Sequence, residues 1–278
     1  MGDGVQLFQY ESHQSRQGNE RLKSTWLATA SLIETMQGRE TMQGFCVACG
    51  CVESMCVRQL DWDSTREGLA CLTCGFSARL RVSLHVLECL AKHDSDIYIT
   101  EQCTRLYAWM QSRYVNLRGS EFEPHAGRRA KLAEVLQAIG GHGEIEYQDV
   151  TALSFADASL DVVLSGDVLE HLPKPAPAFA EFARVLRSGG LLVATFPFND
   201  AADSLVRASI VDGEVVHHLP PEYHGDPIGG GVLCFRYFGW DVLKMAGEAG
   251  FHDCRMAMAW APEAGIMYGH WLLLARKS

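Results

Sequence analysis

Two pairs of cysteines constrain the N-terminal third of this chain more than any other feature. Two residues separate Cys46 from Cys49, 21 residues follow, and Cys71 and Cys74 repeat the spacing. A glycine follows each pair, and glycine allows the positive φ angle of a tight turn that points two thiolates at one ion. The pattern predicts a closed tetrahedral site of four thiolates. Such a site binds structural Zn²⁺, because no coordination position is left open for chemistry.

Buried free thiols and a redox Cys-x-x-Cys pair are the alternatives to zinc. Residues 1–23 are polar and lack the apolar core of a signal peptide. We therefore expect a cytoplasmic chain, in which structural disulfides are rare. Cys51 and Cys56 lie between the pairs as spare thiols. The cysteine segment, at about residues 44–80, has too few apolar side chains to fold alone. Zinc binding contributes folding free energy on the order of 10–16 kcal/mol in peptide models.

The pattern of apolar residues divides the chain into a small module and a larger domain. Apolar residues at helical spacing predict helices over 21–36 and 80–90, and the polar residues 1–20 are expected to fray. Residues 1–92 are thus expected to form a helical and zinc-knuckle module. Residues 93–278 are expected to form the second domain, with an insertion at about 199–239. A length of 278 residues suits one large domain or one domain plus a small module, and the apolar pattern favours the second.

From residue 97 onward, short apolar strands alternate with helices. The alternation predicts an α/β fold, a doubly wound, seven-stranded and mostly parallel sheet whose last two strands are antiparallel. The expected strands lie at 97–100, 117–121, 144–148, 160–164, 191–196, 254–260 and 269–275. The expected helices lie at 106–113, 131–139, 179–186 and 240–248.

Acidic residues stand at the ends of three predicted strands. Glu101 ends the first, Glu121 follows 20 residues later, and Asp149 ends the third. Ligands of such sheets bind at the carboxyl ends of the strands. A carboxylate at the position of Glu121 suits two ribose hydroxyls, and one at Asp149 can accept from an exocyclic amine such as that of adenine.

The fourth and fifth strand regions resemble those of class I S-adenosylmethionine-dependent methyltransferases of the type 11 kind. The resemblance rests on Leu160-Asp161-Val162-Val163, on Val168-Leu169-Glu170-His171-Leu172 and on the run from Phe182 to Leu192, and it covers about residues 95–278. It implies S-adenosylmethionine as cofactor, with ribose on Glu121 and adenine on Asp149. It also implies the candidate cofactor-binding residues Glu101, Gln102, Thr104, Glu121, Phe122, Asp149, Val150, Gly166, Asp167, Val168 and His171.

The first loop departs from that family, in which an acid is usually followed by Gly-x-Gly. Here the loop reads Thr100-Glu101-Gln102-Cys103-Thr104 and contains no glycine. We expect side chains such as Gln102 and Thr104 to contact the cofactor where a glycine backbone would otherwise approach it. For His171, packing or orientation on the cofactor side is favoured over catalysis.

The insertion concentrates polar side chains between His217 and Pro227, in the run His-His-Leu-Pro-Pro-Glu-Tyr-His-Gly-Asp-Pro. Methyl transfer from a sulfonium needs an aligned acceptor and, for a hydroxyl, a base. Histidine suits that role near neutral pH. His224 is the first candidate, with Asp226 to orient it, and His218 is the second. The alternative is a structural polar loop.

These residues favour methyl transfer to a small molecule, at a hydroxyl oxygen. An RNA or protein methyltransferase that uses the zinc module for recognition, and a non-catalytic adaptor with a degenerate cofactor fold, remain open. The net charge of −10, from 24 Lys and Arg against 34 Asp and Glu, counts against a nucleic-acid partner. No apolar run is long enough to predict a membrane span.

Overall fold

The computed structural model describes residues 5–17, 19–57, 60–62 and 65–278, and it divides into two compact units. The first unit contains the N-terminal strand, Gln14–Leu90 and Met256–Leu272. The second unit contains Glu11–His13, Ala91–Arg255 and Leu273–Ser278. Among the described residues, no helix is long and apolar enough to cross a membrane.

The central sheet has an α/β topology, as expected, and seven strands are described in it. The four strands β5, β4, β6 and β7 are parallel neighbours, whereas β15 is antiparallel to β7 and β1 is antiparallel to β14. The order across the sheet is β1 (Gln6–Tyr10), β14 (Phe251–Ala261), β15 (Ile266–Lys277), β7 (Leu186–Thr195), β6 (Leu160–Gly166), β4 (Ile97–Ile99) and β5 (Leu117–Gly119).

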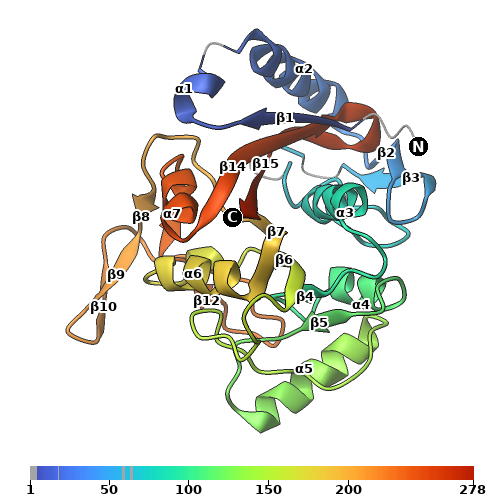
Figure 1. The fold of residues 1–278 in the computed structure, drawn as a ribbon. Helices are drawn as coiled ribbons and strands as arrows, with labels where there is room; N and C mark the ends of the chain where they lie inside the picture. Colours follow the sequence, from blue (N-terminus) through green and yellow to red (C-terminus); the bar gives the residue numbers. More distant parts are fainter. Residues whose placement is uncertain (1–4, 18, 58–59, 63–64) are drawn as a thin grey trace. The chain divides into compact units, whose positions relative to one another are not determined.

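Helices surround the parallel strands of the second unit (Figure 1). They are α4 (Arg105–Gln111), α5 (Ala126–Ala138), α6 (Ala176–Val185) and α7 (Val242–Glu248), with the short 3₁₀ helix η1 (Leu169–His171) directly after β6. Phe179 and Phe182 of α6 are fully buried, as a helix with an apolar stripe requires. The strands are buried on both faces, and Val163, Leu192 and Val193 are without solvent exposure.

The first unit is built around the cysteine segment. It contains α2 (Glu20–Met36), the antiparallel pair β2 (Thr41–Cys46) and β3 (Cys51–Cys56), α3 (Ala78–Leu90), the 3₁₀ helix η2 (Pro262–Ala264) and all but the first residue of the short helix α1 (His13–Arg16). The Asn19 side chain caps α2 by accepting from the amides of Arg21 and Leu22. In the core of this unit, Arg81 is fully buried and donates to the carbonyls of Leu69, Ala264 and Gly265.

The insertion folds into short antiparallel pairs. β10 (Glu214–His217) pairs with β9 (Ala208–Val211), β11 (Tyr223–His224) with β12 (Val232–Leu233), and β13 (Arg236–Tyr237) with β8 (Leu205–Val206). The Phe235 amide donates to the Glu170 carbonyl at 2.8 Å. This bond fastens the insertion to the segment that follows β6.

Two predictions about individual elements were wrong. The expected strand at 144–148 is reduced to one parallel bridge between Tyr147 and Glu121. Residues 6–10 were expected to fray, but they form β1, which pairs with β14 over its whole length. β1 is therefore the seventh strand of the sheet. Residues 1–4 and 18 of the expected frayed segment lie outside the described residues. The helix expected at 131–139 begins earlier, at Ala126.

Candidate active site and candidate metal centre

The carboxyl ends of β4 and β6 are joined by the side chain of Glu101. Its Oε2 atom accepts from the Gly166 amide at 3.1 Å and from the Thr100 hydroxyl at 2.8 Å. Because β4 and β6 are parallel neighbours, their ends lie at one edge of the sheet. Glu101 and Gly166, both candidate cofactor-binding residues, are therefore brought together at the edge where ligands of such sheets bind.

Glu121 holds the glycine-free first loop. It follows β5, and its Oε1 atom accepts from the Cys103 amide at 2.5 Å. Burial raises the pKa of this carboxyl group to about 7, although backbone amides of the loop, first that of Cys103, act in the opposite direction. The carboxylate thus lies next to the loop, where it can also accept from hydroxyl groups of a ligand.

Two side chains of the loop have structural partners. The Gln102 amide donates to the Glu144 carbonyl at 2.7 Å and accepts from the Glu146 amide at 2.8 Å. The Thr104 hydroxyl caps α4 by accepting from the Tyr107 amide at 3.1 Å. These bonds explain how the loop is ordered without glycine. A contact of Gln102 or Thr104 with the cofactor stays a prediction.

The remaining cofactor-binding candidates that follow β5 are Phe122, Asp149 and Val150, which lie in the chain near the bridge between Glu121 and Tyr147. Phe122 is 69% exposed, and its ring lies 5.8 Å from that of Tyr147, the residue that forms the bridge with Glu121. Asp149 forms a local turn in which its Oδ1 accepts from the amide and the hydroxyl of Thr151. Val150 is buried. The exposed rings of Phe122 and Tyr147 thus lie next to Glu121.

The segment after β6 has an unusual backbone. Asp167 adopts a positive φ of 56°, which is uncommon outside glycine and is often retained at functional sites. Its amide donates to the Thr195 carbonyl at 2.9 Å, and its Oδ1 accepts from the Thr195 hydroxyl at 3.1 Å. Val168 is half-buried, and η1 follows it. The turn therefore places Glu170 and His171 directly beyond the strand end.

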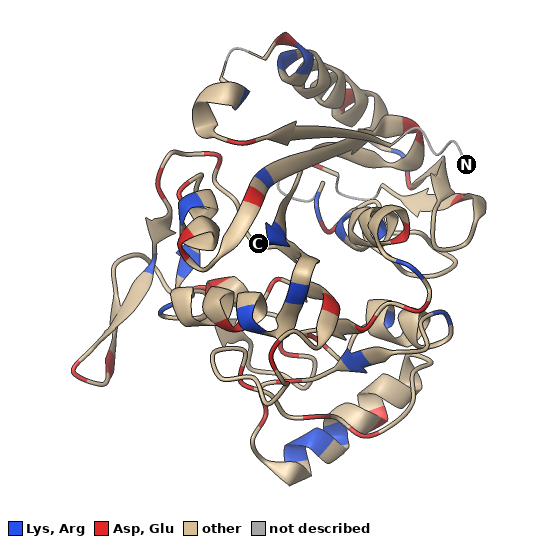
Figure 2. Cartoon of the chain, viewed as in Figure 1, with Lys and Arg blue, Asp and Glu red and all other residues tan. Residues whose placement is uncertain are grey.

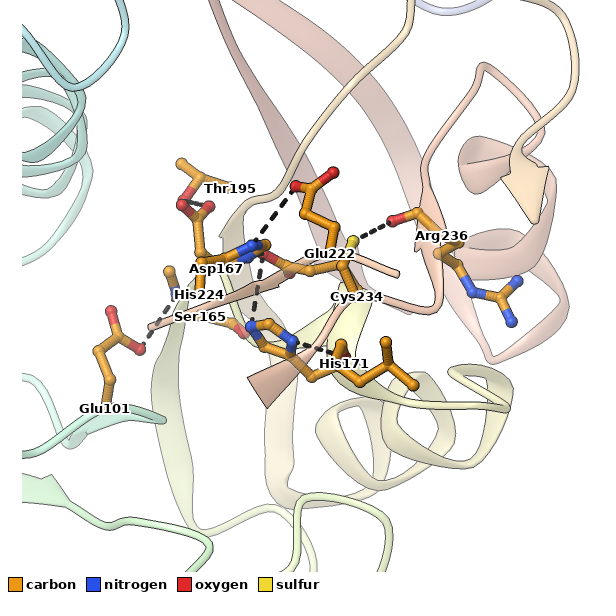
Figure 3. A network of polar contacts seen from close by, with 12 residues as sticks. Glu101, Ser165, Asp167, His171, Thr195, Glu222, His224, Cys234 and Arg236 are labelled. Atoms are coloured by element: carbon orange, nitrogen blue, oxygen red, sulfur yellow. Dashed lines mark hydrogen bonds and ion pairs between the residues drawn. The ribbon is translucent and has the colours of Figure 1, made fainter. Parts of the chain in front are cut away.

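Three side chains meet there, and we call Glu170, His171 and His224 the Glu170 cluster. Figure 3 shows the two histidines of this cluster close together. The Glu170 side chain is fully buried. Its Oε1 atom lies 3.4 Å from Nε2 of His224 and 4.0 Å from Nε2 of His171. The two imidazole rings are 4.6 Å apart. One potential ligand atom from each residue lies within 4.8 Å of the others.

The cluster perturbs the pKa of each member. Burial raises the pKa of Glu170 to about 7, although the hydrogen bond with His224 lowers it. That hydrogen bond raises the pKa of His224 above its ordinary value. Burial lowers the pKa of His171, whose Nδ1 bonds with the Leu233 carbonyl at 3.0 Å. Groups with shifted pKa values at a strand end occur often at functional sites.

The structure separates the three catalytic candidates. His224 joins the Glu170 cluster, whereas His218 is exposed and bonds with the Ser209 hydroxyl at 2.9 Å. The Oδ1 atom of Asp226 accepts from the Ile228 amide, and its Oδ2 lies 3.5 Å from Nη2 of Arg128.

The carboxylates beside His224 are therefore those of Glu170 and Glu222, and not that of Asp226. The Oε1 atom of Glu222 lies 3.5 Å from Nδ1 of His224 (Figure 3). Its Oε2 atom accepts from the Tyr237 hydroxyl and from Arg207. Sequence reasoning missed Glu222. The one signal for it was its place two residues before His224 in the polar run.

The four paired cysteines of the first unit also meet. The Sγ atoms of Cys46 and Cys74 are 3.6 Å apart, and those of Cys49 and Cys71 are 3.9 Å apart. Zn–S bonds of about 2.3 Å in a tetrahedron require S–S distances of about 3.8 Å. Each pair closes a turn in which Gly50 or Gly75, at φ of 72° and 75°, donates to the carbonyl of the first cysteine. The donor set fits a zinc ion.

The spare cysteines lie outside this group of four. Cys51 is exposed and bonds with Glu53, and Cys56 lies at the far end of β3. The cysteine group that could hold a metal ion thus consists of Cys46, Cys49, Cys71 and Cys74 among the described residues.

Comparison with known sequences finds a methyltransferase domain. Residues 103–194 match the family model of that name. An uncharacterized methyltransferase of Mycobacterium marinum is 46% identical over 83 residues, and one of Mycobacterium avium is 36% identical over 84 residues. Each match covers 30% of this chain and 30% of the relative. The matched stretch begins in the loop that follows β4 and includes the strands β5 and β6 and most of β7. It supports a class I methyltransferase domain in the second unit.

Solved structures resemble the chain more loosely. An S-adenosylmethionine-dependent methyltransferase from Mesorhizobium loti has 16% identity and a TM-score of 0.45, covering 69% of this chain and 96% of that one. The 1,6-didemethyltoxoflavin-N1-methyltransferase of Burkholderia thailandensis has 18% identity and a TM-score of 0.43, covering 72% and 79%.

Proposed function

We propose that the second unit binds S-adenosylmethionine and transfers its methyl group to a small-molecule acceptor. The observation that carries the proposal is the placement of Glu101, Glu121 and the Gly166–Asp167 turn at the carboxyl ends of neighbouring parallel strands, within or beside the stretch that matches a methyltransferase domain. Ligands of doubly wound sheets bind at this edge. The cofactor supplies a methyl group already activated as part of a sulfonium ion.

The residues of this edge fit the adenosyl part of that cofactor. Glu121 is a largely buried carboxylate, and ribose hydroxyls would donate to it. Asp149 follows the Tyr147 bridge and would accept from the adenine amine. Phe122 and Tyr147 offer exposed rings beside Glu121 against which a base can pack.

For the metal-free chain, we propose that the acceptor atom is a hydroxyl oxygen and that His224 takes its proton. His224 is held beyond β6 by contacts to Glu170 and Glu222. Glu222 faces Nδ1 and would hold a proton there, whereas Nε2 contacts Glu170 at 3.4 Å. Nε2 would therefore take the acceptor's proton once the acceptor hydroxyl displaces Glu170 from it. Glu222 takes the orienting role that the sequence assigned to Asp226.

We also propose that Cys46, Cys49, Cys71 and Cys74 bind one structural Zn²⁺ ion. The Sγ distances and the two glycine turns support this proposal. Four thiolates leave no open coordination position, so the ion would stabilise the fold of the first unit without taking part in methyl transfer.

Calorimetric titration with S-adenosylmethionine tests the central proposal. We expect one binding site per chain and an affinity about 10- to 100-fold weaker in Glu121→Gln, because hydrogen bonds to a charged acceptor are worth about 1.5–3 kcal/mol. Glu134→Gln, at an exposed position on α5, is the matched control. No binding by the unaltered chain would contradict the proposal and favour a non-catalytic adaptor.

The role of His224 is tested separately. Mass spectrometry of small molecules that co-purify with the S-adenosylhomocysteine complex would supply an acceptor. With that acceptor, His224→Ala should lose methyl transfer and keep cofactor binding, while His218→Ala should retain both. Unchanged turnover in the His224 variant would refute its role.

A further inference from the structure

The Glu170 cluster has the donor set of a transition-metal site. It presents one carboxylate and two imidazoles, whose ligand atoms lie within 4.8 Å of one another. Metal–ligand bonds of about 2.0–2.2 Å bring neighbouring ligand atoms to about 3–3.5 Å. The distance of 3.4 Å between Glu170 Oε1 and His224 Nε2 already has this value, and His171 Nε2 at 4.0 Å needs a small rotation of its ring.

Both histidines are oriented as metal-binding histidines are. In such sites the ring nitrogen that does not bind the ion donates to a carbonyl or a carboxylate. Here Nδ1 of His171 contacts the Leu233 carbonyl at 3.0 Å, and Nδ1 of His224 faces the Glu222 carboxylate at 3.5 Å. With protons on both Nδ1 atoms, the lone pairs of both Nε2 atoms are directed to the side where Glu170 lies.

Glu170 provides a second, independent observation. The residue has no solvent exposure, and its Oε2 atom has no hydrogen-bond partner among the described residues. A buried polar atom without a partner is costly unless an ion or a water satisfies it. The nearby carboxylates of Asp167 and Glu222 add negative charge around the cluster, which also favours a cation.

We propose that Glu170, His171 and His224 bind one divalent transition-metal ion of the kind that two imidazoles and one carboxylate select, such as Fe²⁺, Mn²⁺, Co²⁺ or Zn²⁺. Three protein ligands leave coordination positions open, unlike the four-thiolate site. An acceptor hydroxyl bound at an open position would lose its proton more readily, as metal-bound water does.

This inference rests on the proposed function, which brings an acceptor hydroxyl close to the Glu170 cluster. It changes the role that the proposal gives to His224. In the metal-loaded chain, Nε2 of His224 is a ligand and takes no proton. The cation would lower the pKa of the bound hydroxyl, and a water molecule would take the released proton. His224 acts as a base only in the metal-free chain.

Co²⁺ titration of the zinc-loaded chain tests the site, because cobalt spectra distinguish nitrogen and oxygen ligands from thiolates. We expect one Co²⁺ per chain, with ligand-field bands and no sulfur-to-cobalt charge transfer. His224→Ala and His171→Ala should each weaken binding at least tenfold. His218→Ala, which alters an exposed histidine of the same insertion, should bind as the unaltered chain does. Circular dichroism of each variant checks that it is folded.

Three results would overturn the inference. The first is no Co²⁺ binding beyond the thiolate site, and the second is a charge-transfer band that accounts for all bound Co²⁺. The third is that the folded His171→Ala and His224→Ala variants bind Co²⁺ with the same affinity as the unaltered chain. Calorimetry with S-adenosylmethionine on the same samples separates this failure from that of the proposed function. A chain that binds the cofactor but no Co²⁺ keeps the proposed function, with His224 as base, whereas a chain that binds only Co²⁺ loses that function and keeps the metal site.

Discussion

At the scale of single residues, Glu121 gives the site a dependence on pH. Its pKa is raised to about 7 by burial, and ribose hydroxyls need the ionised form as acceptor. Between pH 8 and pH 6 the ionised fraction falls about tenfold. We therefore expect the affinity for S-adenosylmethionine to fall by about that factor over this range.

The raised pKa of Glu121 also makes the stability of the fold depend on pH, but stability falls as the pH rises whereas cofactor affinity increases. A carboxyl group whose pKa is raised on folding favours the folded state below its unfolded pKa, and this contribution is lost as the pH rises through about 7. Glu121→Gln should therefore flatten the pH profile of binding, and it should be more stable than the unaltered chain only at the alkaline end. Calorimetry and thermal unfolding at several pH values measure both. An equally steep binding profile in the variant would show that another group titrates.

At the scale of elements, the cysteine turns should depend on zinc. The hairpin β2–β3 and the Cys71–Gly75 turn bury few large apolar side chains, and metal binding supplies folding free energy to such segments. We expect one zinc per chain by elemental analysis. Cys74→Ser should lose the ion and lower the melting temperature, whereas Cys51→Ser, outside the group of four, should keep both. Zinc retained at full stoichiometry in Cys74→Ser would contradict the site.

Elements with a strong local pattern could be predicted from the sequence, and elements defined by distant partners could not. The apolar run of residues in β6 predicts a buried strand, and the apolar stripe of α6 predicts a helix packed on the sheet. In 144–148 only Ile145 is buried, and the Glu144 carbonyl and the Glu146 amide bond with the Gln102 side chain, which no strand pattern reveals. β1 is short, and its partner β14 lies about 250 residues away in the sequence.

The same reason divides the predictions about the site. The acids at strand ends and the cysteine pairs follow from local spacing, so their positions could be predicted. The contacts of His224 depend on how the insertion folds. Pairing of β11 with β12 and the bond from Phe235 to the Glu170 carbonyl bring His224 to Glu170, and neither has a signal in the sequence.

At the scale of the whole molecule, the first unit is not a continuous stretch of chain. It includes Met256–Leu272, and Arg81 donates to the carbonyls of Ala264 and Gly265 from that stretch. A fragment of residues 1–92 would leave the buried Arg81 guanidinium short of these acceptors. We expect such a fragment to show no cooperative unfolding transition even with zinc. A zinc-loaded fragment as stable as the full chain would establish the boundary at residue 92 as that of an independent domain.

The charge of the molecule opposes a nucleic-acid partner. The net charge is −10, and Figure 2 shows acidic residues on many of the elements that also carry basic ones. Nucleic-acid affinity depends on Lys and Arg that displace the counterions of phosphates. The chain should therefore not retard a structured RNA in a gel at physiological salt, with or without S-adenosylmethionine. A shift that weakens steeply as salt is added would instead indicate a local basic surface and favour an RNA methyltransferase, with the zinc module as the first segment to test for recognition.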